Sequence, residues 1–246
     1  MKKAKVIVVM PAFNAEKTLE KTYQDLPSDL VDEVIVVDDK SQDRTVEIAH
    51  KLGLKIFVHP QNLGYGGNQK TCYWEALKRK PDVVVMLHPD YQYDSTKTRE
   101  LVRPILEGDY DVMFGSRIRT REEAMRGGMP LTKYILNRIF CLIENIILGV
   151  NFSEHFSGFR AYSRKVLETV PFQRFSNDFV FDQEMMASAI AFGFKVGETP
   201  VPVRYFSESS SIKFFKGAKF LLETLLVLLQ FLLNKYGIVK DKLFRQ

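Results

Sequence analysis

The sequence predicts an α/β fold in which a mostly parallel central sheet is flanked by helices. Short apolar runs alternate with longer, polar, helix-like segments from residue 5 to residue 115. These runs are continuously apolar, which is typical of strands covered on both faces, as in parallel sheets. The chain has 246 residues and 46% hydrophobic content, enough to bury one large core.

The apolar runs define five expected strands, at Lys5–Met10, Glu33–Val37, Lys55–Val58, Val83–Leu87 and Asp111–Gly115. Four helices are expected between them, at Glu16–Asp25, Asp43–Leu52, Gln69–Arg79 and Thr96–Glu107. This alternation predicts a doubly wound sheet with right-handed crossovers. The first apolar run is too short for a signal peptide and ends at Pro11, so we interpret it as a strand.

The pattern changes after residue 115, and basic residues outnumber acidic ones from 117 to 138. We expect helices at Tyr134–Leu148 and Phe179–Phe194, a strand at Lys195–Arg204, and an apolar helical tail. The expected organisation is one domain, 1–212, in which residues 1–117 and residues 118–212 form two successive regions, followed by the tail 213–246.

Charge and cysteine content narrow the possible partners and location. The net charge of +5 and the pI of about 9.0 suit an anionic partner such as a nucleotide phosphate, a lipid headgroup or a nucleic acid. We disfavour nucleic acid, because no platform of interleaved aromatic and basic residues is present and 30 acidic residues offset the basic ones. Cys72 and Cys141 stand far apart, which predicts a reduced, cytoplasmic protein without a zinc knuckle.

All five expected strands end in polar or glycine-rich segments. These are PAFNAE (11–16), DDKSQDRT (38–45), HPQNLGYGGNQ (59–69), HPDYQYD (88–94) and GSR (115–117). Ligands of such sheets bind at the carboxyl ends of the strands, so the five segments predict one composite cleft.

Three of these segments carry chemistry that the residues alone leave open. Asp38 and Asp39 could accept hydrogen bonds from a base or a ribose, or they could be solvated beside a helix cap. Glycines from Gly64 to Gly67 could bring backbone amides close to a phosphate, or form a plain turn.

The third segment, HPDYQYD, combines possible metal ligands. Asp90 offers oxygen ligands suited to Mg²⁺ or Mn²⁺, and Gln92 can add a carbonyl oxygen. His88 suits Mn²⁺ better than Mg²⁺, or it is a hydrogen-bonded histidine that positions a neighbour.

Taken together, the segments resemble family 2 glycosyltransferases of the GT-A fold, which is Rossmann-like, and most closely the dolichol-phosphate mannose synthase branch. The resemblance covers about residues 5–212 and also includes GGMP (127–130), Asn137-Arg138, SEHFSGFR (153–160), FDQE (181–184) and ETPVPVRY (198–205). Each motif is weak alone, and their order and spacing carry the resemblance.

The resemblance implies roles for individual residues. Those implied to bind the nucleotide sugar are Pro11, Asn14, Glu16, Asp38, Asp39, Gly64, Gly66 and His88. Asp90, Gln92 and His88 fall on the metal motif, where the branch has an aspartate in place of His88. Arg117 and Arg204 are implied to neutralise phosphate charge, and Arg138, Ser157 and Arg160 to bind the acceptor or its phosphate.

The implied reaction is an inverting transfer of a sugar from a GDP- or UDP-linked donor, assisted by Mg²⁺ or Mn²⁺. A polyprenyl phosphate acceptor is largely ionised at neutral pH and needs no strong base. A saccharide hydroxyl would need one, and Glu154 and Asp182 are the candidates. Both could instead be structural, with Glu154 or Asp182 orienting Arg160 or capping a helix. A protein that binds nucleotide sugars without catalysis is the remaining alternative, suggested by His88.

The C-terminal tail predicts contact with a membrane surface. Phe220–Leu233 is almost wholly apolar, but its fourteen residues give about 21 Å of helix, short of a bilayer core of about 30 Å. Seven basic residues against two acidic ones from Lys213 onward favour anionic lipid. We therefore expect an interfacial helix at the inner face of the membrane, the alternative being a buried or dimer-forming helix.

Overall fold

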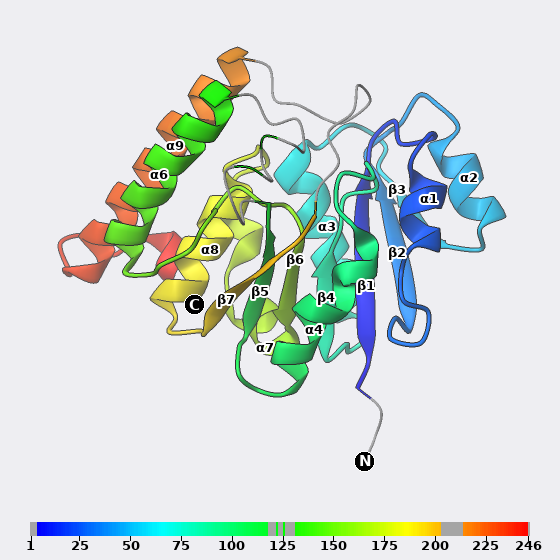
Figure 1. Ribbon diagram of the computed structural model, residues 1–246, viewed down its shortest axis with the longest axis horizontal. Helices are drawn as coiled ribbons and strands as arrows, with labels where there is room; N and C mark the ends of the chain where they lie inside the picture. Colours follow the sequence, from blue (N-terminus) through cyan, green and yellow to red (C-terminus); the bar gives the residue numbers. More distant parts are fainter. Residues whose placement is uncertain (1–3, 118–121, 123–124, 126–130, 203–213, 246) are drawn as a thin grey trace.

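The computed structural model describes residues 4–117, 122, 125, 131–202 and 214–245, and its centre is a seven-stranded sheet (Figure 1). The strands are β1 (Val6–Ala12), β2 (Glu33–Asp38), β3 (Lys55–Val58), β4 (Val83–Met86), β5 (Val112–Ser116), β6 (Arg160–Ser163) and β7 (Val196–Pro200). The sheet order is β3-β2-β1-β4-β6-β5-β7, and among these described strands only β6 runs antiparallel to its neighbours. The mostly parallel α/β sheet expected from the sequence is thus confirmed.

Helices cover both faces of the sheet. They are α1 (Leu19–Gln24), α2 (Thr45–Lys51), α3 (Tyr65–Leu77), α4 (Thr98–Leu106), α6 (Leu131–Leu148), α7 (Arg164–Thr169), α8 (Phe181–Ala191) and α9 (Phe214–Lys235). Three short 3₁₀ turns lie at η1 (Ser95–Lys97), η2 (Phe172–Arg174) and η3 (Lys242–Phe244).

Alternate residues of each buried strand enter two different cores. Val6, Val8 and Met10 of β1 pack with α1, α2 and α4, whereas Ile7 and Val9 pack with α3, α7 and α8. Because side chains alternate across a strand, a continuously apolar run can fill both cores at once. This explains why these strands show no polar face in the sequence.

The C-terminal segment is part of this architecture. Val227, Leu228 and Phe231 on the inner side of α9 join the core formed with α8, and Phe244 of η3 packs edge-on against Phe231. Figure 1 shows α6 and α9 side by side along one flank of the molecule, at the left of the view.

The order of the strands places the polar segments that follow them. Strand order reverses between β1 and β4, which is the switch point where ligands bind in open α/β sheets. The residues that follow β1, β2 and β4 therefore meet at one edge of the sheet, as the sequence predicts.

The glycine segment differs from the expected loop, because α3 begins at Tyr65, four residues earlier than predicted. The amides of Gly66 and Gly67 both donate to the main-chain oxygen of Asn177. A Cβ atom on Gly64 would lie 2.7 Å from that oxygen, and one on Gly66 would lie 2.7 Å from Cβ of Phe181. Glycine is required here because the segment before α8 packs directly against the first turn of α3.

Candidate functional site

Two loops at the ends of β1 and β2 hold each other through side chain to main chain hydrogen bonds. Asn14 Oδ1 accepts from the amide of Gln42 at 2.9 Å, and the amide of Asn14 donates to Ser41 Oγ at 2.8 Å. Glu16 Oε2 accepts from the amide of Arg44 at 3.1 Å. Asn14 and Glu16, expected to contact a nucleotide, are thus seen shaping the loops, while Pro11 is buried within β1 beside Val37.

The adjacent aspartates after β2 have different surroundings. Asp39 accepts from His59 Nδ1 at 2.8 Å, from the amide of Leu63 at 2.8 Å and from that of Gly64 at 3.0 Å. Its carboxylate therefore holds the loop before α3. Asp38 is fully buried, and its Oδ1 accepts from the amide of Ser41, whereas its Oδ2 has no partner in the described structure.

An unpartnered buried carboxylate oxygen is costly, so Asp38 Oδ2 marks a place where a ligand donor fits. Of the two aspartates, Asp38 has the acceptor atom that is not already used within the protein. The sequence alone could not show which of the two aspartates is free to bind a ligand, because the partners of Asp39 lie beyond the next helix and strand.

His88 at the end of β4 belongs to a chain of hydrogen bonds. Its Nε2 lies 3.0 Å from the hydroxyl of Tyr65, which donates to Asp182 Oδ2 at 2.7 Å. Burial raises the pKa of the Tyr65 phenol, and the neighbouring Asp182 raises it further, so the phenol keeps its proton. Burial also lowers the pKa of His88, which favours the neutral imidazole.

These bonds fix the tautomer of His88. The phenol proton goes to Asp182, so the phenol oxygen accepts from His88 Nε2–H, and the imidazole keeps its lone pair on Nδ1. Histidines that bind metals are commonly oriented in this way by a partner on the other ring nitrogen. Tyr65, which the sequence did not single out, therefore positions His88, and Asp182 anchors Tyr65.

Asp90 and Gln92 follow His88 in the turn after β4. Asp90 Oδ1 accepts from the amide of Gln92 at 3.1 Å, and the Gln92 side chain is buried. Within the described residues, no cluster of three or more His, Cys, Asp or Glu side chains could hold a metal ion. Mg²⁺ is commonly held by one or two carboxylates plus substrate phosphates, and Asp90 offers one such carboxylate, so the metal role of this turn stays a prediction.

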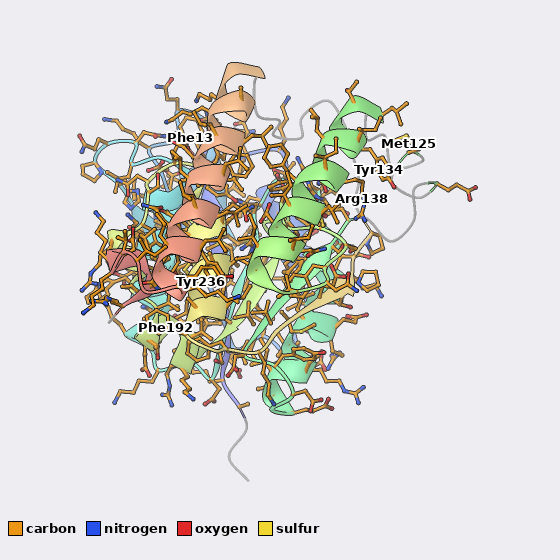
Figure 2. All side chains as sticks on the ribbon, turned by 90° about the vertical axis from the view of Figure 1, so that its left-hand side faces the viewer. Phe13, Met125, Tyr134, Arg138, Phe192 and Tyr236 are labelled. Atoms are coloured by element: carbon orange, nitrogen blue, oxygen red, sulfur yellow. The ribbon has the colours of Figure 1, made fainter. Side chains whose placement is uncertain are left out.

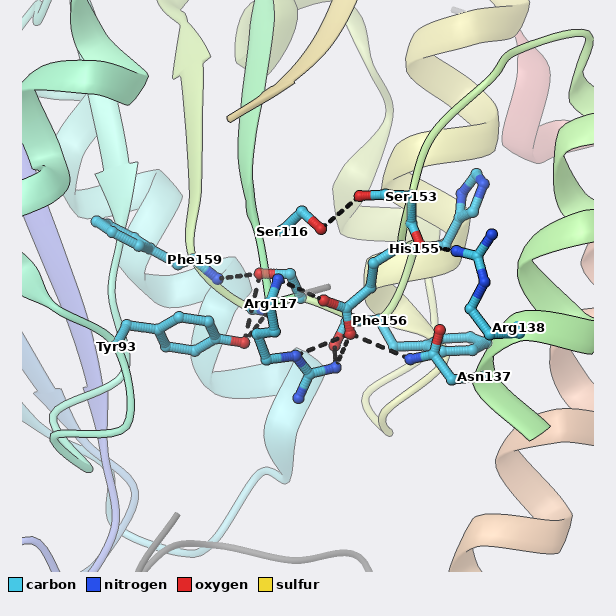
Figure 3. A network of polar contacts seen from close by, with 12 residues as sticks. Tyr93, Ser116, Arg117, Asn137, Arg138, Ser153, His155, Phe156 and Phe159 are labelled. Atoms are coloured by element: carbon cyan, nitrogen blue, oxygen red, sulfur yellow. Dashed lines mark hydrogen bonds and ion pairs between the residues drawn. The ribbon is translucent and has the colours of Figure 1, made fainter. Parts of the chain in front are cut away.

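Glu154 is fully buried and surrounded by donors, of which Figure 3 labels Arg117 and Asn137. It accepts from the amide of Arg117 at 2.8 Å, from Arg117 Nε at 2.8 Å, from Arg117 Nη2, and from Asn137 Nδ2 at 3.1 Å. Arg117 Nη2 also donates to the main-chain oxygen of Phe156. The alternative in which Glu154 orients Arg160 is wrong, because its partner is Arg117.

Arg160 and Ser157 lie deeper than the sequence suggested. Arg160 is fully buried, and its guanidinium donates to the main-chain oxygens of His155, Ser157 and Asp182. Ser157 Oγ lies 3.3 Å from the hydroxyl of Tyr93, also in the interior. Internal partners use both side chains in this arrangement, which supports the loop 153–160, and their expected contact with the acceptor stays a prediction.

Arg138 remains at the surface of α6, where its Nη1 donates to the main-chain oxygen of Ser153 (Figures 2 and 3). It is placed beside the segment that carries Glu154. Arg204 and the GGMP motif lie outside the described residues.

Polar side chains on the inner side of α6 hold this segment in place. Asn145 accepts from the amide of Phe152 at 3.0 Å and donates to its oxygen at 2.8 Å, while Cys141 Sγ donates to the same oxygen. His155 Nε2 lies 2.9 Å from Asn145 Oδ1, and His155 Nδ1 lies 3.3 Å from Glu144. The sequence did not reveal these contacts between α6 and the segment 152–155. A signal was present, because the polar residues of this apolar helix recur every three or four positions and so share one side of it.

Comparison with known proteins identifies the family. Glycosyl transferase family 2 matches residues 7–170, and the chain belongs to this family. The protein is therefore a glycosyltransferase.

An uncharacterized protein of Methanocaldococcus jannaschii is 32% identical over 209 residues, covering 85% of both chains. A UDP-N-acetylglucosamine–dolichyl-phosphate N-acetylglucosaminyltransferase of Methanococcus voltae is 26% identical, over 81% of this chain and 86% of its own length.

The fold also matches a solved structure. Glucosyl-3-phosphoglycerate synthase of Mycobacterium tuberculosis, crystallised with Mn²⁺, UDP and phosphoglyceric acid, superposes with a TM-score of 0.72 at 18% identity. The match covers 97% of this chain and 80% of that one. The GT-A fold expected from the sequence is thereby confirmed.

We expect the buried Glu144 to make the stability of the fold depend on pH. Burial raises its pKa from 4.5 to about 8, against an opposing effect of Arg160. The folded protein then holds a proton that the unfolded chain releases, so the free energy of unfolding should fall as pH rises from 4.5 to about 8. The loss should be on the order of a few kcal/mol.

Urea unfolding of the wild type and of Glu144→Gln between pH 6.5 and 8 measures this effect. Burial lowers the pKa of His155 to about 3, so its effect on the free energy of unfolding changes with pH only below about 6.5. His155 therefore does not affect the slope between pH 6.5 and 8. Burial raises the pKa of Glu184 to about 7, and this residue changes the free energy of unfolding by the same amount in the wild type and in Glu144→Gln. Stability should fall more steeply in the wild type; parallel curves would show that Glu144 is ionised in the fold.

Proposed function

We propose that the protein transfers a sugar, with inversion, from a nucleotide sugar to a polyprenyl phosphate such as a dolichyl or undecaprenyl phosphate. This would place it with the dolichol-phosphate mannose synthase branch of its family. The observation that carries the proposal is the state of the two candidate bases. Glu154 is fully buried against Arg117 and Asn137, and Asp182 accepts from Tyr65 and from Gln69 Nε2 at 3.1 Å.

A general base must be free to take a proton from the acceptor. The oxygens of both carboxylates already accept hydrogen bonds within the protein, so taking a proton from an acceptor would require these contacts to break. The arrangement of Glu154 and Asp182 therefore supports an acceptor that arrives ionised, and a lipid phosphate is largely ionised at neutral pH. The name of the Methanococcus voltae relative, which includes a dolichyl-phosphate acceptor, supports the same choice.

Asp38 supports the donor side of the proposal. Its unpartnered Oδ2 would accept a hydrogen bond from the base or ribose of a bound nucleotide. UDP is the nucleotide in the M. tuberculosis structure and in the name of the M. voltae relative, which favours a UDP-linked over a GDP-linked sugar. Pro11, Asn14, Glu16 and Asp39 would shape this pocket; Gly64 and Gly66 would support its floor.

The remaining predicted site residues would neutralise negative charge on the diphosphate and on the acceptor phosphate. Asp90, His88 and Gln92 would hold Mg²⁺ or Mn²⁺, which neutralises charge on the diphosphate as it leaves. Arg117 keeps its guanidinium fixed by Glu154 and would stabilise phosphate charge without reorganising. Exposed Arg138 would meet the acceptor phosphate, and we assign Arg204 a similar role. Residues 1–117 would then bind the donor and 118–212 the acceptor.

A polyprenyl phosphate keeps its phosphate at the membrane surface, so the transferase must work there. Within the described residues, one helix, Lys216–Lys235, is long and apolar enough to cross a membrane by length and composition. The net charge of +5 suits the anionic inner face. We propose a cytoplasmic protein attached peripherally to that face, with the tail 213–246 contributing to attachment.

Turnover with UDP- and GDP-sugars, with and without a short-chain polyprenyl phosphate and Mn²⁺, tests the proposal. We expect release of nucleoside diphosphate that depends on the lipid, and its loss by at least about a hundredfold in Asp90→Asn with the fold intact. Transfer to saccharides alone would contradict the acceptor. Nucleotide binding without any turnover would identify a binding protein, and near-full activity of Asp90→Asn would refute the metal assignment.

We also expect Tyr65→Phe to weaken Mn²⁺-dependent binding of UDP by about tenfold or more, because His88 loses the partner that orients its ring. Calorimetric titration of UDP with Mn²⁺ and with EDTA separates the metal-dependent contribution. Tyr110→Phe, at an exposed tyrosine outside this hydrogen-bonded chain, is the matched control. Equal Mn²⁺-dependent affinities in Tyr65→Phe and wild type would exclude His88 from the metal site.

A further inference from the structure

Helix α6 has its polar and apolar sides reversed relative to an ordinary surface helix. Three of its buried positions, Asn137, Cys141 and Glu144, are polar or weakly polar and face the protein, and only near its end does the apolar Leu148 join the core. Its exposed positions carry large apolar side chains along the whole helix, with exposed fractions from 46% to 73%: Leu131, Ile135, Leu136, Ile139, Leu142 and Ile146. A surface helix in water normally shows the opposite arrangement.

Helix α9 continues this apolar surface. Thr224 is fully buried, while Leu222, Leu225, Leu226 and Leu229 are between 40% and 60% exposed. Figure 2 shows α6 and α9 side by side on the same flank. Phe156 lies between them, with its ring 6.5 Å from Phe140 of α6 and 5.4 Å from Phe220 of α9. We call the exposed leucines and isoleucines of the two helices the α6–α9 face.

The α6–α9 face is too large to be a set of scattered surface residues. Ten large aliphatic side chains line two helices of 18 and 22 residues, about 27 and 33 Å long. Contiguous apolar surfaces of this kind mark contact with a partner or a membrane.

Packing against the domain prevents α9 from crossing a bilayer. Its inner residues Val227, Leu228 and Phe231 belong to the core with α8 and η3, and Lys219 pairs with Asp178 at 2.7 Å. A spanning helix would have to pull these contacts, and the polar domain behind them, into the hydrocarbon. The exposed side alone can enter lipid, which requires the helix axis to lie along the membrane plane.

We propose that the α6–α9 face docks into the interface of an anionic lipid bilayer, with both helices parallel to the membrane plane. Charge favours lipid over a second copy of the chain. Exposed basic side chains lie on or beside the two helices: Arg138 on α6, Lys216 near the start of α9 and Lys240 beyond its end. Lys219 is already paired with Asp178 and Glu223, and Lys235 lies over the ring of the inward-facing Phe231. In a symmetric dimer the first three cations would lie close to one another, whereas anionic headgroups neutralise them.

This orientation deepens the proposed function, on which it rests for the nature of the acceptor. The outer side of α6 meets the lipid, while its inner side binds the segment 152–157 through Asn137, Asn145 and Cys141. Arg138, on the same helix, then lies at the level of the headgroups. The lipid surface and the site that receives its phosphate are thus two sides of one helix.

Flotation of the full chain with vesicles tests the docking without donor or acceptor. We expect binding to phosphatidylcholine vesicles containing phosphatidylglycerol, and weaker binding to phosphatidylcholine alone. The pairs Leu142→Glu with Ile146→Glu, and Leu225→Glu with Leu229→Glu, should each reduce binding by about tenfold or more. Leu106→Glu and Trp74→Glu, at exposed apolar residues elsewhere, should bind as wild type. Equal binding of all variants would overturn the proposal.

Depth measurement tests the orientation. In a Trp74→Phe background, single tryptophans at Leu222, Tyr236 and Ile146 should be quenched by the same shallowly brominated lipids. The first two are 14 residues apart, about 21 Å along the helix direction, so a spanning helix would place them at different depths and refute the in-plane orientation.

Two outcomes distinguish lipid docking from dimerisation and from the proposed transfer activity. A lipid-free dimer in sedimentation velocity that Leu142→Glu dissociates, with no vesicle binding, would assign the face to a second copy and overturn lipid docking. Vesicle binding through this face without transfer to polyprenyl phosphate would refute the proposed function and leave the docking intact.

Discussion

The buried ion pair between Arg117 and Glu154 joins the segments of the molecule on which the site depends. Arg117 follows β5, Glu154 lies in the segment between α6 and β6, and Asn137 reaches the same carboxylate from α6. Burying such a pair is favourable only when further hydrogen bonds satisfy it, and here the amide of Arg117 and the amide side chain of Asn137 do so. Removing one partner would leave a buried charge, at a cost of about 3–5 kcal/mol.

Other polar side chains around the site also hold neighbouring segments in place. Asp39 holds the loop before α3, Asp182 holds Tyr65, and Arg160 ties the 155–157 segment to α8. In each case an ionisable side chain is used to fix a neighbour. Asp38, at the end of β2, differs, because its buried Oδ2 has no partner in the described structure, and it lies close to the switch point of the sheet. This division between positioning groups and ligand-binding groups gives the site its chemistry.

Helix α6 connects this interior to the exterior of the protein. Several of its inner residues are polar, which is unusual for a helix packed on an apolar core, and most of its outer residues are apolar, which is unusual for a helix facing water. Both are explained if the inner side serves the polar site and the outer side serves lipid. A rigid site next to the membrane surface suits an acceptor whose reactive phosphate cannot leave that surface.

The sequence predicted β1, β2 and β4 well, because each contains a continuous apolar run followed by a polar segment. It did not reveal β6, since Arg160–Ser163 has four residues and no apolar run. From the sequence, the glycines near Gly66 could form a phosphate loop or a plain turn. In the structure they pack against the main chain at Asn177, a contact that the sequence could not reveal because Asn177 is distant along the chain. Likewise, Glu154 could be paired with Arg117 only once β5 and the segment after α6 were placed side by side.

The pH dependence of kcat in the wild type and in Glu154→Gln tests the central claim most directly. If Glu154 positions Arg117 and the acceptor arrives ionised, the variant should be slower, yet both proteins should show the same rise in kcat near about pH 6, where the lipid phosphate ionises. Loss of that rise in Glu154→Gln alone would show that Glu154 takes the proton itself, and would contradict the account.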